Sequence, residues 1–166
     1  KNCSKIETVV HLCAQILKCG NKIMLLGNGG SAADAQHIAA EFVNRLRKTR
    51  RDRPPLAALA LTTDSSVLTS ISNDSDFSNV FSRQIEALGK KGDLAWGIST
   101  SGNSPNIIKA FKIARDVGIT TVGFTGGGGG VMGTVADHHF TVESSDTTRI
   151  QEVQITLAHV ICELIE

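Results

Sequence analysis

Residues 23–31 read Ile-Met-Leu-Leu-Gly-Asn-Gly-Gly-Ser, an apolar run that ends in a glycine-rich turn. The residues from 32 to about 47 are rich in Ala and carry apolar side chains at helical spacing. Before the apolar run, residues 6–17 show the same spacing and stop at Gly20, a common C-terminal stop for a helix. The stretch therefore predicts a helix, a buried strand, a tight turn and a second helix, in that order.

Four further apolar segments repeat the strand pattern along the chain. They cover residues 56–61, 94–98, 121–124 and 139–142, and a closing helix is expected over residues 150–165. Short strands that are apolar throughout and alternate with helices are typical of a parallel sheet covered on both faces. We therefore predict an α/β fold, a three-layer αβα sandwich with a five-stranded parallel sheet, as one domain over residues 1–166.

Composition excludes several classes of protein. The chain has 17 Lys and Arg against 16 Asp and Glu, so its net charge of +1 provides no field that would attract nucleic acid or an anionic membrane. No apolar run approaches the roughly 20 residues that span a bilayer. The four cysteines form no CxxC pair, which is the usage of a reduced compartment. We expect a cytoplasmic protein with a local functional site and with neither nucleic acid nor a membrane as partner.

Two segments stand out from this background. The closing helix is apolar on more than one face, which exceeds what one face of a sheet covers, so we expect it to contact other copies of the chain. Residues 45–53 read Arg-Leu-Arg-Lys-Thr-Arg-Arg-Asp-Arg and precede two prolines. We expect this basic stretch to end the second helix and form an exposed loop. A phosphate or nucleic-acid patch is the less favoured alternative, because no aromatic residue lies within it.

Two loops follow predicted strands at the edge of the sheet where ligands of such folds bind. In the first, residues 27–31, the glycines let backbone amides approach an anion, and the next helix offers unpaired N–H groups. Two alternatives remain open for this loop. It is either a tight turn with Ser31 as N-cap, or a relaxed dinucleotide fingerprint over residues 27–32 that lacks the acidic residue expected about 20 residues later.

The second loop reads Ser99-Thr-Ser-Gly-Asn-Ser-Pro105 and places four hydroxyls around one turn. Ser104 suits the N-cap of the next helix, and Pro105 suits its first position. A purely structural cap is the alternative reading. Each loop alone could have a purely structural role. Because two such loops occur in one small sheet, a phosphorylated ligand is favoured.

Three sets of side chains are candidates for chemistry. His37 and Glu41 lie four residues apart and share a helix face, although an ordinary surface pair has the same spacing. Gln151 and His159 stand out in the apolar closing helix; a capping box from Thr148 to Gln151 and a core histidine are the alternatives. The adjacent pair at 138–139 would point to opposite faces of a strand, which does not suit a shared metal.

Five segments, in this order along the chain, resemble the sugar isomerase (SIS) family. They are Gly27-Asn-Gly-Gly-Ser31 with the helix as far as Arg45, Ala60-Leu-Thr-Thr-Asp64, Ser72-Asn-Asp74, Gly97-Ile-Ser-Thr-Ser-Gly-Asn-Ser104 and Arg149-Ile-Gln-Glu152. The resemblance implies a flavodoxin-like, phosphosugar-binding domain. The branch it resembles converts sedoheptulose 7-phosphate to D-glycero-D-manno-heptose 7-phosphate by acid/base proton transfer through an enediolate, the first step of heptose synthesis for lipopolysaccharide. Members of that branch are cytoplasmic homotetramers with active sites at subunit interfaces.

The resemblance also assigns roles to residues. Glu41 and His159 match the catalytic acid/base pair of the family. The zinc site of some members, with one ion per subunit, matches His37, Glu41, Gln151 and His159. The residues that match substrate contacts are Asn28, Gly29, Gly30, Ser31, Arg45, Asn73, Asp74, Ser99, Thr100, Ser101, Ser104 and Gln151. Thr148 stands where some members carry an Asp, so one sugar contact is in doubt.

Two expectations remain alternatives at this point. Gln151 and His159 are eight residues apart, about 12 Å along a helix, so they meet at one ion only if both stretch toward it or if different subunits supply them. A non-catalytic branch of the family, a regulator that binds a replication-initiation protein, keeps the fold and the hydroxyl loop but not the Glu and the late His. The presence of Glu41 and His159 favours the enzyme.

Overall fold

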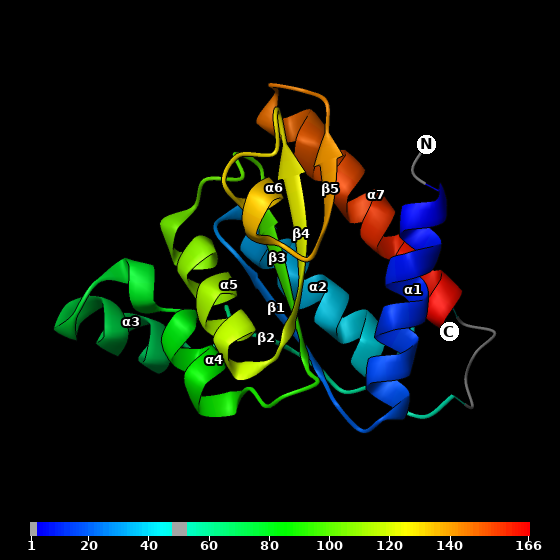
Figure 1. The fold of residues 1–166 in the computed structure, drawn as a ribbon, viewed down its shortest axis with the longest axis horizontal. Coiled ribbons are helices and arrows are strands. Elements are labelled where there is room, and N and C mark those ends of the chain that lie inside the picture. Colours follow the sequence, from blue (N-terminus) through cyan, green and yellow to red (C-terminus); the bar gives the residue numbers. More distant parts are fainter. Residues whose placement is uncertain (1–2, 48–52) are drawn as a thin grey trace.

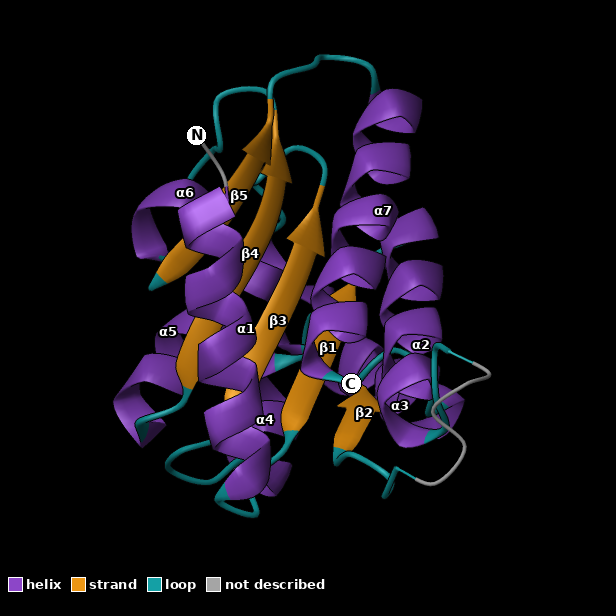
Figure 2. Ribbon diagram, turned by 90° about the vertical axis from the view of Figure 1, so that its right-hand side faces the viewer, coloured by secondary structure: helices purple, strands orange, loops and turns teal. Residues whose placement is uncertain are grey.

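The computed structural model describes residues 3–47 and 53–166, and within them it contains a five-stranded, all-parallel sheet. The spatial order of the strands is β2-β1-β3-β4-β5. Figures 1 and 2 show this twisted sheet with helices on both of its faces, so the predicted three-layer α/β architecture is confirmed. The strands are β1 (Ile23–Gly27), β2 (Ala58–Ala60), β3 (Leu94–Ser99), β4 (Thr120–Gly126) and β5 (His138–Val142).

The helices form one layer on each face of the sheet. Helices α1 (Cys3–Lys18), α2 (Gly30–Val43) and α7 (Thr147–Ile165) share one apolar cluster with the sheet. The opposite layer contains α3 (Ser65–Asp74), a 3₁₀ turn (Phe77–Asn79), α4 (Ser82–Leu88), α5 (Pro105–Val117) and α6 (Met132–Val135). In Figure 1, α1 and α7 lie to the right of the sheet and α4 and α5 to its left.

The central strands are buried on both faces, as expected for a parallel sheet between two helical layers. Every residue of β1 and β3 is buried. Because side chains alternate along a strand, Ile23 and Leu25 join the cluster with α1, α2 and α7, whereas Met24 and Leu26 join the cluster with α4 and α5. The alternation divides the apolar residues of one short strand between two separate cores.

The strand order produces a topological switch point between β1 and β3. After β1 the chain crosses to the β2 edge, and after β3 it crosses to the β4 edge, so the loops that leave these neighbouring strands diverge. The two strands pair as far as Gly27 opposite Ile98, which places the loops 27–31 and 99–104 next to each other. In open parallel sheets the ligand binds at such a switch point.

The bounds of several elements differ from those predicted. Helix α2 ends at Val43 rather than near residue 47, because the backbone N–H of Leu56 on the returning chain donates to the carbonyl of Phe42. Strand β2 is only three residues long, and α7 begins at Thr147 rather than at 150. Of the basic stretch 45–53, residues 48–52 lie outside the described residues.

Two of the alternative structural interpretations, the Ser31 N-cap and the Thr148–Gln151 capping box, do not form. The N-cap of α2 is Gly29, and Ser31 lies buried inside the first turn of the helix. The N-cap of α7 is Asp146, whose carboxylate accepts from the backbone N–H groups of Thr148 and Arg149. With Asp146 in that place, Thr148 lies within the helix, so the capping box with Gln151 does not form. A capping box therefore does not explain the presence of Gln151 at this position.

No helix of the described chain is long and apolar enough to cross a membrane.

The cysteines divide into two groups: Cys3 and Cys19 are exposed, and Cys13 and Cys162 are buried in the cluster shared by α1 and α7. Burial raises the pKa of the Cys13 and Cys162 thiols to about 12. All four are free thiols, as the reduced-compartment usage predicts.

Close packing of α5 on β3 gives a test of the fold. A Cβ at Gly97 would lie 2.7 Å from both Ile107 Cγ2 and Phe111 Cζ. We therefore expect Gly97→Ala to lower the free energy of unfolding by about 1–3 kcal/mol through overpacking. Gly128→Ala is the control, because no atom lies within 4 Å of its Cβ position. Urea unfolding at equal protein concentration measures both, and equal stability of Gly97→Ala and the parent chain would contradict this packing.

Candidate functional site

The hydroxyl loop that follows β3 gathers three of its four predicted phosphate ligands. Ser99 Oγ lies 2.9 Å from Ser104 Oγ and 3.4 Å from Ser101 Oγ. Ser104 is the N-cap of α5 and is followed by Pro105, as predicted, but its hydroxyl pairs with Ser99 instead of capping the helix. Thr100 lies in the same turn. The cluster therefore places hydroxyls at the N-terminal end of α5, where the helix dipole is positive.

A further glycine-rich loop, residues 126–130, packs against the hydroxyl loop. The backbone N–H of Met132 donates to the carbonyl of Gly102, and a Cβ at Gly102 would lie only 2.1 Å from the carbonyl oxygen of Gly129. Gly102 also has a φ of 65°, so both its conformation and its close contact require glycine. Sequence reasoning gave the run Gly126–Gly130 no role in the site, although five successive glycines after a buried strand were the available signal.

Asn28 links the glycine loop, residues 27–31, to the start of α5, which follows the hydroxyl loop. Its side-chain amide and that of Asn106 form two reciprocal hydrogen bonds of 3.0 and 2.8 Å. Asn106 is buried in the first turn of α5, and its side-chain oxygen also accepts from the backbone N–H of Ile107. Sequence reasoning missed Asn106; its only signal was a polar residue directly after a helix-starting proline. The pair fixes the glycine loop against the hydroxyl loop.

Helices α2 and α7 bring the two predicted catalytic residues together. His37 Nε2 lies 2.8 Å from His159 Nε2, and Glu41 Oε1 lies 3.5 Å from His37 Nε2. Glu41 is largely buried, with 16% of its side chain exposed, whereas His37 keeps 48%. His159 is half-buried rather than a core histidine. His37 lies seven residues after Gly30, so the cluster is about 10 Å along α2 from the glycine loop.

Asp34 is a further acidic group near this cluster that sequence reasoning did not select. It precedes His37 by three residues, so it lies on the same side of α2. One of its carboxylate oxygens, Oδ2, is buried without a hydrogen-bond partner. Burial raises the pKa of the Asp34 carboxyl, and the nearby His37 and His159 imidazoles act in the opposite direction.

The predicted zinc ligands are only partly brought together. In the described part of the chain, no group of three or more His, Cys, Asp and Glu side chains is placed so that it could hold a metal ion as it stands. The two imidazoles and the Glu41 carboxylate are nevertheless ligands that zinc accepts. His37 Nε2 lies 2.8 Å from His159 Nε2 and 3.5 Å from Glu41 Oε1. Two ligand atoms of a tetrahedral zinc ion lie roughly 3.3 Å apart, which is between these two distances. The donor set therefore fits zinc after small side-chain movements.

Gln151 is not part of that group within one chain. A Cβ at Gly30 would lie 2.5 Å from Gln151 Nε2, so the Gln151 carboxamide packs against the start of α2. This contact belongs to the glycine loop rather than to the imidazoles further along the helix. The absence of a side chain at Gly30 is what allows the first turns of α2 and α7 to approach.

Three other predicted substrate contacts lie apart from the two loops in this chain. Arg45 follows the 14-residue helix α2, which places it about 20 Å from the glycine loop along the axis. Asn73 donates to Asp74 at the end of α3. Asp74 lines a hollow of about 610 Å³ together with Arg83 and Lys109, and no residue of either loop lines it.

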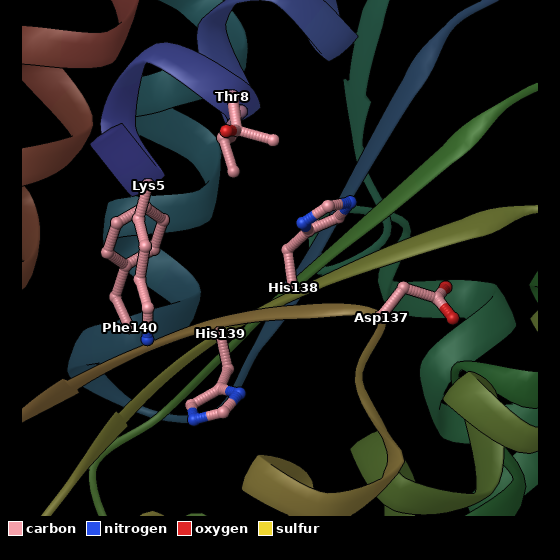
Figure 3. A pocket seen from close by; sticks show the side chains of 7 residues that line it. Lys5, Thr8, Asp137, His138, His139 and Phe140 are labelled. Carbon is pink, nitrogen blue, oxygen red and sulfur yellow. The ribbon is translucent and has the colours of Figure 1, made fainter. Parts of the chain in front are cut away.

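The adjacent histidines on β5 form no shared site. Figure 3 shows His138 directed toward Thr8 of α1 and His139 directed to the other side of the strand, as predicted for neighbouring strand residues. They border a hollow of about 260 Å³ that Lys5 also lines. Burial and the Lys5 charge lower the pKa of His139. This hollow lies at the amino end of β5, opposite the edge that carries the two loops.

Comparison with known proteins gives a consistent family. A family profile described as SIS domain matches residues 1–126. The phosphoheptose isomerase of Aquifex aeolicus is 56% identical over 162 residues, which cover 98% of this chain and 83% of that protein. The solved structure of a phosphoheptose isomerase from Neisseria gonorrhoeae is 43% identical with a TM-score of 0.91, covering 99% of this chain and 86% of that one. For the Francisella tularensis phosphoheptose isomerase the identity is 33% and the TM-score 0.92, with 98% and 85% covered.

These likenesses extend over nearly the whole chain and include both loops, α2 and α7. They give the alternative of a non-catalytic regulator no support. The chain belongs to the SIS domain family and, within it, to the phosphoheptose isomerases.

Proposed function

We propose that this chain isomerises sedoheptulose 7-phosphate to D-glycero-D-manno-heptose 7-phosphate, the first step of heptose synthesis for lipopolysaccharide. The observation that carries the proposal is the convergence of Glu41, His37 and His159 on neighbouring helices, one of which starts at the glycine loop next to the hydroxyl loop. An acid/base pair next to an anion site is what an aldose–ketose isomerisation requires. The names of the similar proteins from Aquifex and Neisseria support the same reaction.

The phosphate is assigned to the hydroxyl loop. Ser99, Ser101 and Ser104 already share hydrogen bonds, so their hydroxyls can turn toward a bound anion without moving the backbone. The N-terminus of α5 adds the positive end of the helix dipole. Thr100 in the same turn and the backbone of Gly29 and Gly30 complete the assignment. The sugar then extends along α2 toward the imidazoles.

Proton transfer is assigned to Glu41 and His159. Moving the carbonyl from C2 to C1 removes a proton from C1 and delivers one to C2, through an enediolate. Glu41 takes the carbon-bound proton and returns it to the neighbouring carbon, while His159 moves the proton between the two oxygens. Each group contributes roughly 10²- to 10⁴-fold to the rate. Asp34, whose carboxyl pKa is raised by burial, lies near both imidazoles.

Zinc is part of the proposal. His37, Glu41 and His159 would hold the ion, and Gln151, from this chain or a neighbouring one, would be the fourth ligand. When bound, zinc supplies Lewis-acid polarisation of the substrate carbonyl. The chain's own residues orient the sugar and move the protons.

A homotetramer in the cytoplasm completes the proposal. Val153, Val160 and Leu164 are exposed large apolar side chains on α7, and they lie on one stripe of the helix. Such a stripe needs a partner surface. Arg45 and Asp74, which lie apart from the loops in their own chain, are the residues we assign to a neighbouring subunit's active site.

Substitution of the acid/base pair tests the reaction. We expect Glu41→Gln and His159→Gln to lower kcat by about 10²- to 10⁴-fold, because each removes a proton-transfer group but keeps its size. Formation of the aldose phosphate is measured, and binding of sedoheptulose 7-phosphate is followed by calorimetry. Asp116→Asn, at an exposed carboxylate near the end of α5, is the matched control and should keep full activity.

Full turnover by Glu41→Gln would remove Glu41 from the base role. Binding of the sugar phosphate by the unaltered chain without any conversion would instead favour the regulatory member of the family over the enzyme.

Metal content tests the zinc assignment. After purification without chelator, elemental analysis should find one zinc ion per subunit, and His37→Ala should carry much less because it loses one imidazole ligand. Dialysis against a chelator should lower turnover, and added zinc should restore it. A metal-free preparation whose activity is indifferent to chelator would end the zinc assignment.

A further inference from the structure

Arg53 and Glu166 form an ion pair that is almost completely buried. Arg53 Nε donates to Glu166 Oε1 at 2.9 Å, and only 9% and 2% of the two side chains are exposed. A buried pair contributes little net stability when compared with apolar side chains, because both charges lose their hydration. The pair is better explained by the backbone geometry that it imposes.

The guanidinium binds the last turn of α2. Arg53 Nη2 donates to the backbone carbonyl of Glu41 at 2.6 Å, and Nη1 donates to that of Phe42 at 2.9 Å. These carbonyls lie at the helix end, where the helix itself provides no donor. Arg53 therefore holds the backbone of the residue that we assign as the catalytic base.

The carboxylate binds the segment that follows α2. Glu166 accepts from the backbone N–H of Leu46 at 2.7 Å and from that of Arg47 at 3.1 Å. Burial acts to raise the pKa of Glu166, but these N–H groups and Arg53 outweigh it, so the pKa lies below the ordinary value. An ion pair between Arg47 and Glu163 lies beside this contact.

The position of Glu166 relates the pair to the other catalytic residue. Glu166 is the C-cap of α7 and comes seven residues, or about two helical turns, after His159. Both residues therefore lie on the same side of α7. One end of the ion pair is thus fixed to the α2 residue Glu41 and the other to the α7 face that carries His159. Together they set how closely the two helices approach at the catalytic cluster.

We infer that Arg53 and Glu166 are positioning residues for the isomerisation proposed above, holding α2 against α7 so that Glu41, His37 and His159 converge. The inference rests on the proposed function. Neither side chain contacts substrate or moves a proton. Their effect is exerted through the backbone of Glu41 and the course of α7.

The test separates positioning from stability with four variants. Arg53→Lys keeps the charge but has no planar fork, so it cannot donate to Glu166 and to two carbonyls at once. We expect its kcat to fall by about tenfold or more, with KM for sedoheptulose 7-phosphate within a factor of about two because the hydroxyl loop is untouched. Ile85→Ala, which creates a cavity on the other face of the sheet, is a destabilised control and should keep its kcat well below its melting temperature.

The double variant Arg53→Met with Glu166→Met is the decisive comparison. It leaves no unpaired buried charge, so its melting temperature should recover relative to Arg53→Met alone. Its kcat should stay low, because no donor reaches the Glu41 carbonyl. A double variant or an Arg53→Lys variant with the parent kcat would overturn the inference. The unaltered chain is assayed first: if it binds but does not convert the sugar phosphate, the proposed function itself fails, and the inference fails with it.

Discussion

The packing of α2 against α7 is the contact on which the proposed catalytic arrangement depends. Three contacts define it, one at each end and one between. Gln151 packs on Gly30 where the helices begin, His159 meets His37 two turns later, and Glu166 joins Arg53 where α2 ends. The helices start from β1 and from the edge strand β5, so the sheet alone does not bring them together. Glycine at the first contact and a buried ion pair at the last set the spacing of the imidazoles between them.

The sheet contributes a different constraint, which is the place of the ligand. Because the chain turns to opposite sides after β1 and after β3, their loops diverge at the place where ligands of such sheets bind. Asn28 and Asn106 connect these two loops. The part that we propose binds the anion thus depends on strand order, whereas the part that we propose transfers protons depends on helix packing. The two parts share only α2, which starts in the first and carries His37 and Glu41 to the second.

Much of the fold could be predicted from the sequence, because apolar runs closed by glycine or hydroxyl residues mark parallel strands directly. The end of α2 and the cap of α7 could not, because they involve hydrogen bonds from Leu56 and Arg53 and to Asp146 that no periodicity reveals. In the site, helical spacing indicated only that His37 and Glu41 share a face. The partnership with His159 came from the family resemblance, because 122 residues separate the two histidines. Arg53 was placed in an exposed basic loop, yet the structure buries it.

The open side of His37 has a consequence for the fate of hydrogen during turnover. Within one chain nearly half of the His37 side chain faces solvent, and Glu41, which we propose carries the abstracted hydrogen, keeps 16% of its side chain exposed, so water has access to it. A carboxylic acid in contact with water exchanges its hydrogen rapidly, and sugar made in heavy water would then carry deuterium at the newly protonated carbon. A neighbouring subunit that covered the exposed side of His37 would reduce the incorporation of deuterium. The deuterium content of the product therefore measures how well contacts between subunits exclude water from these residues.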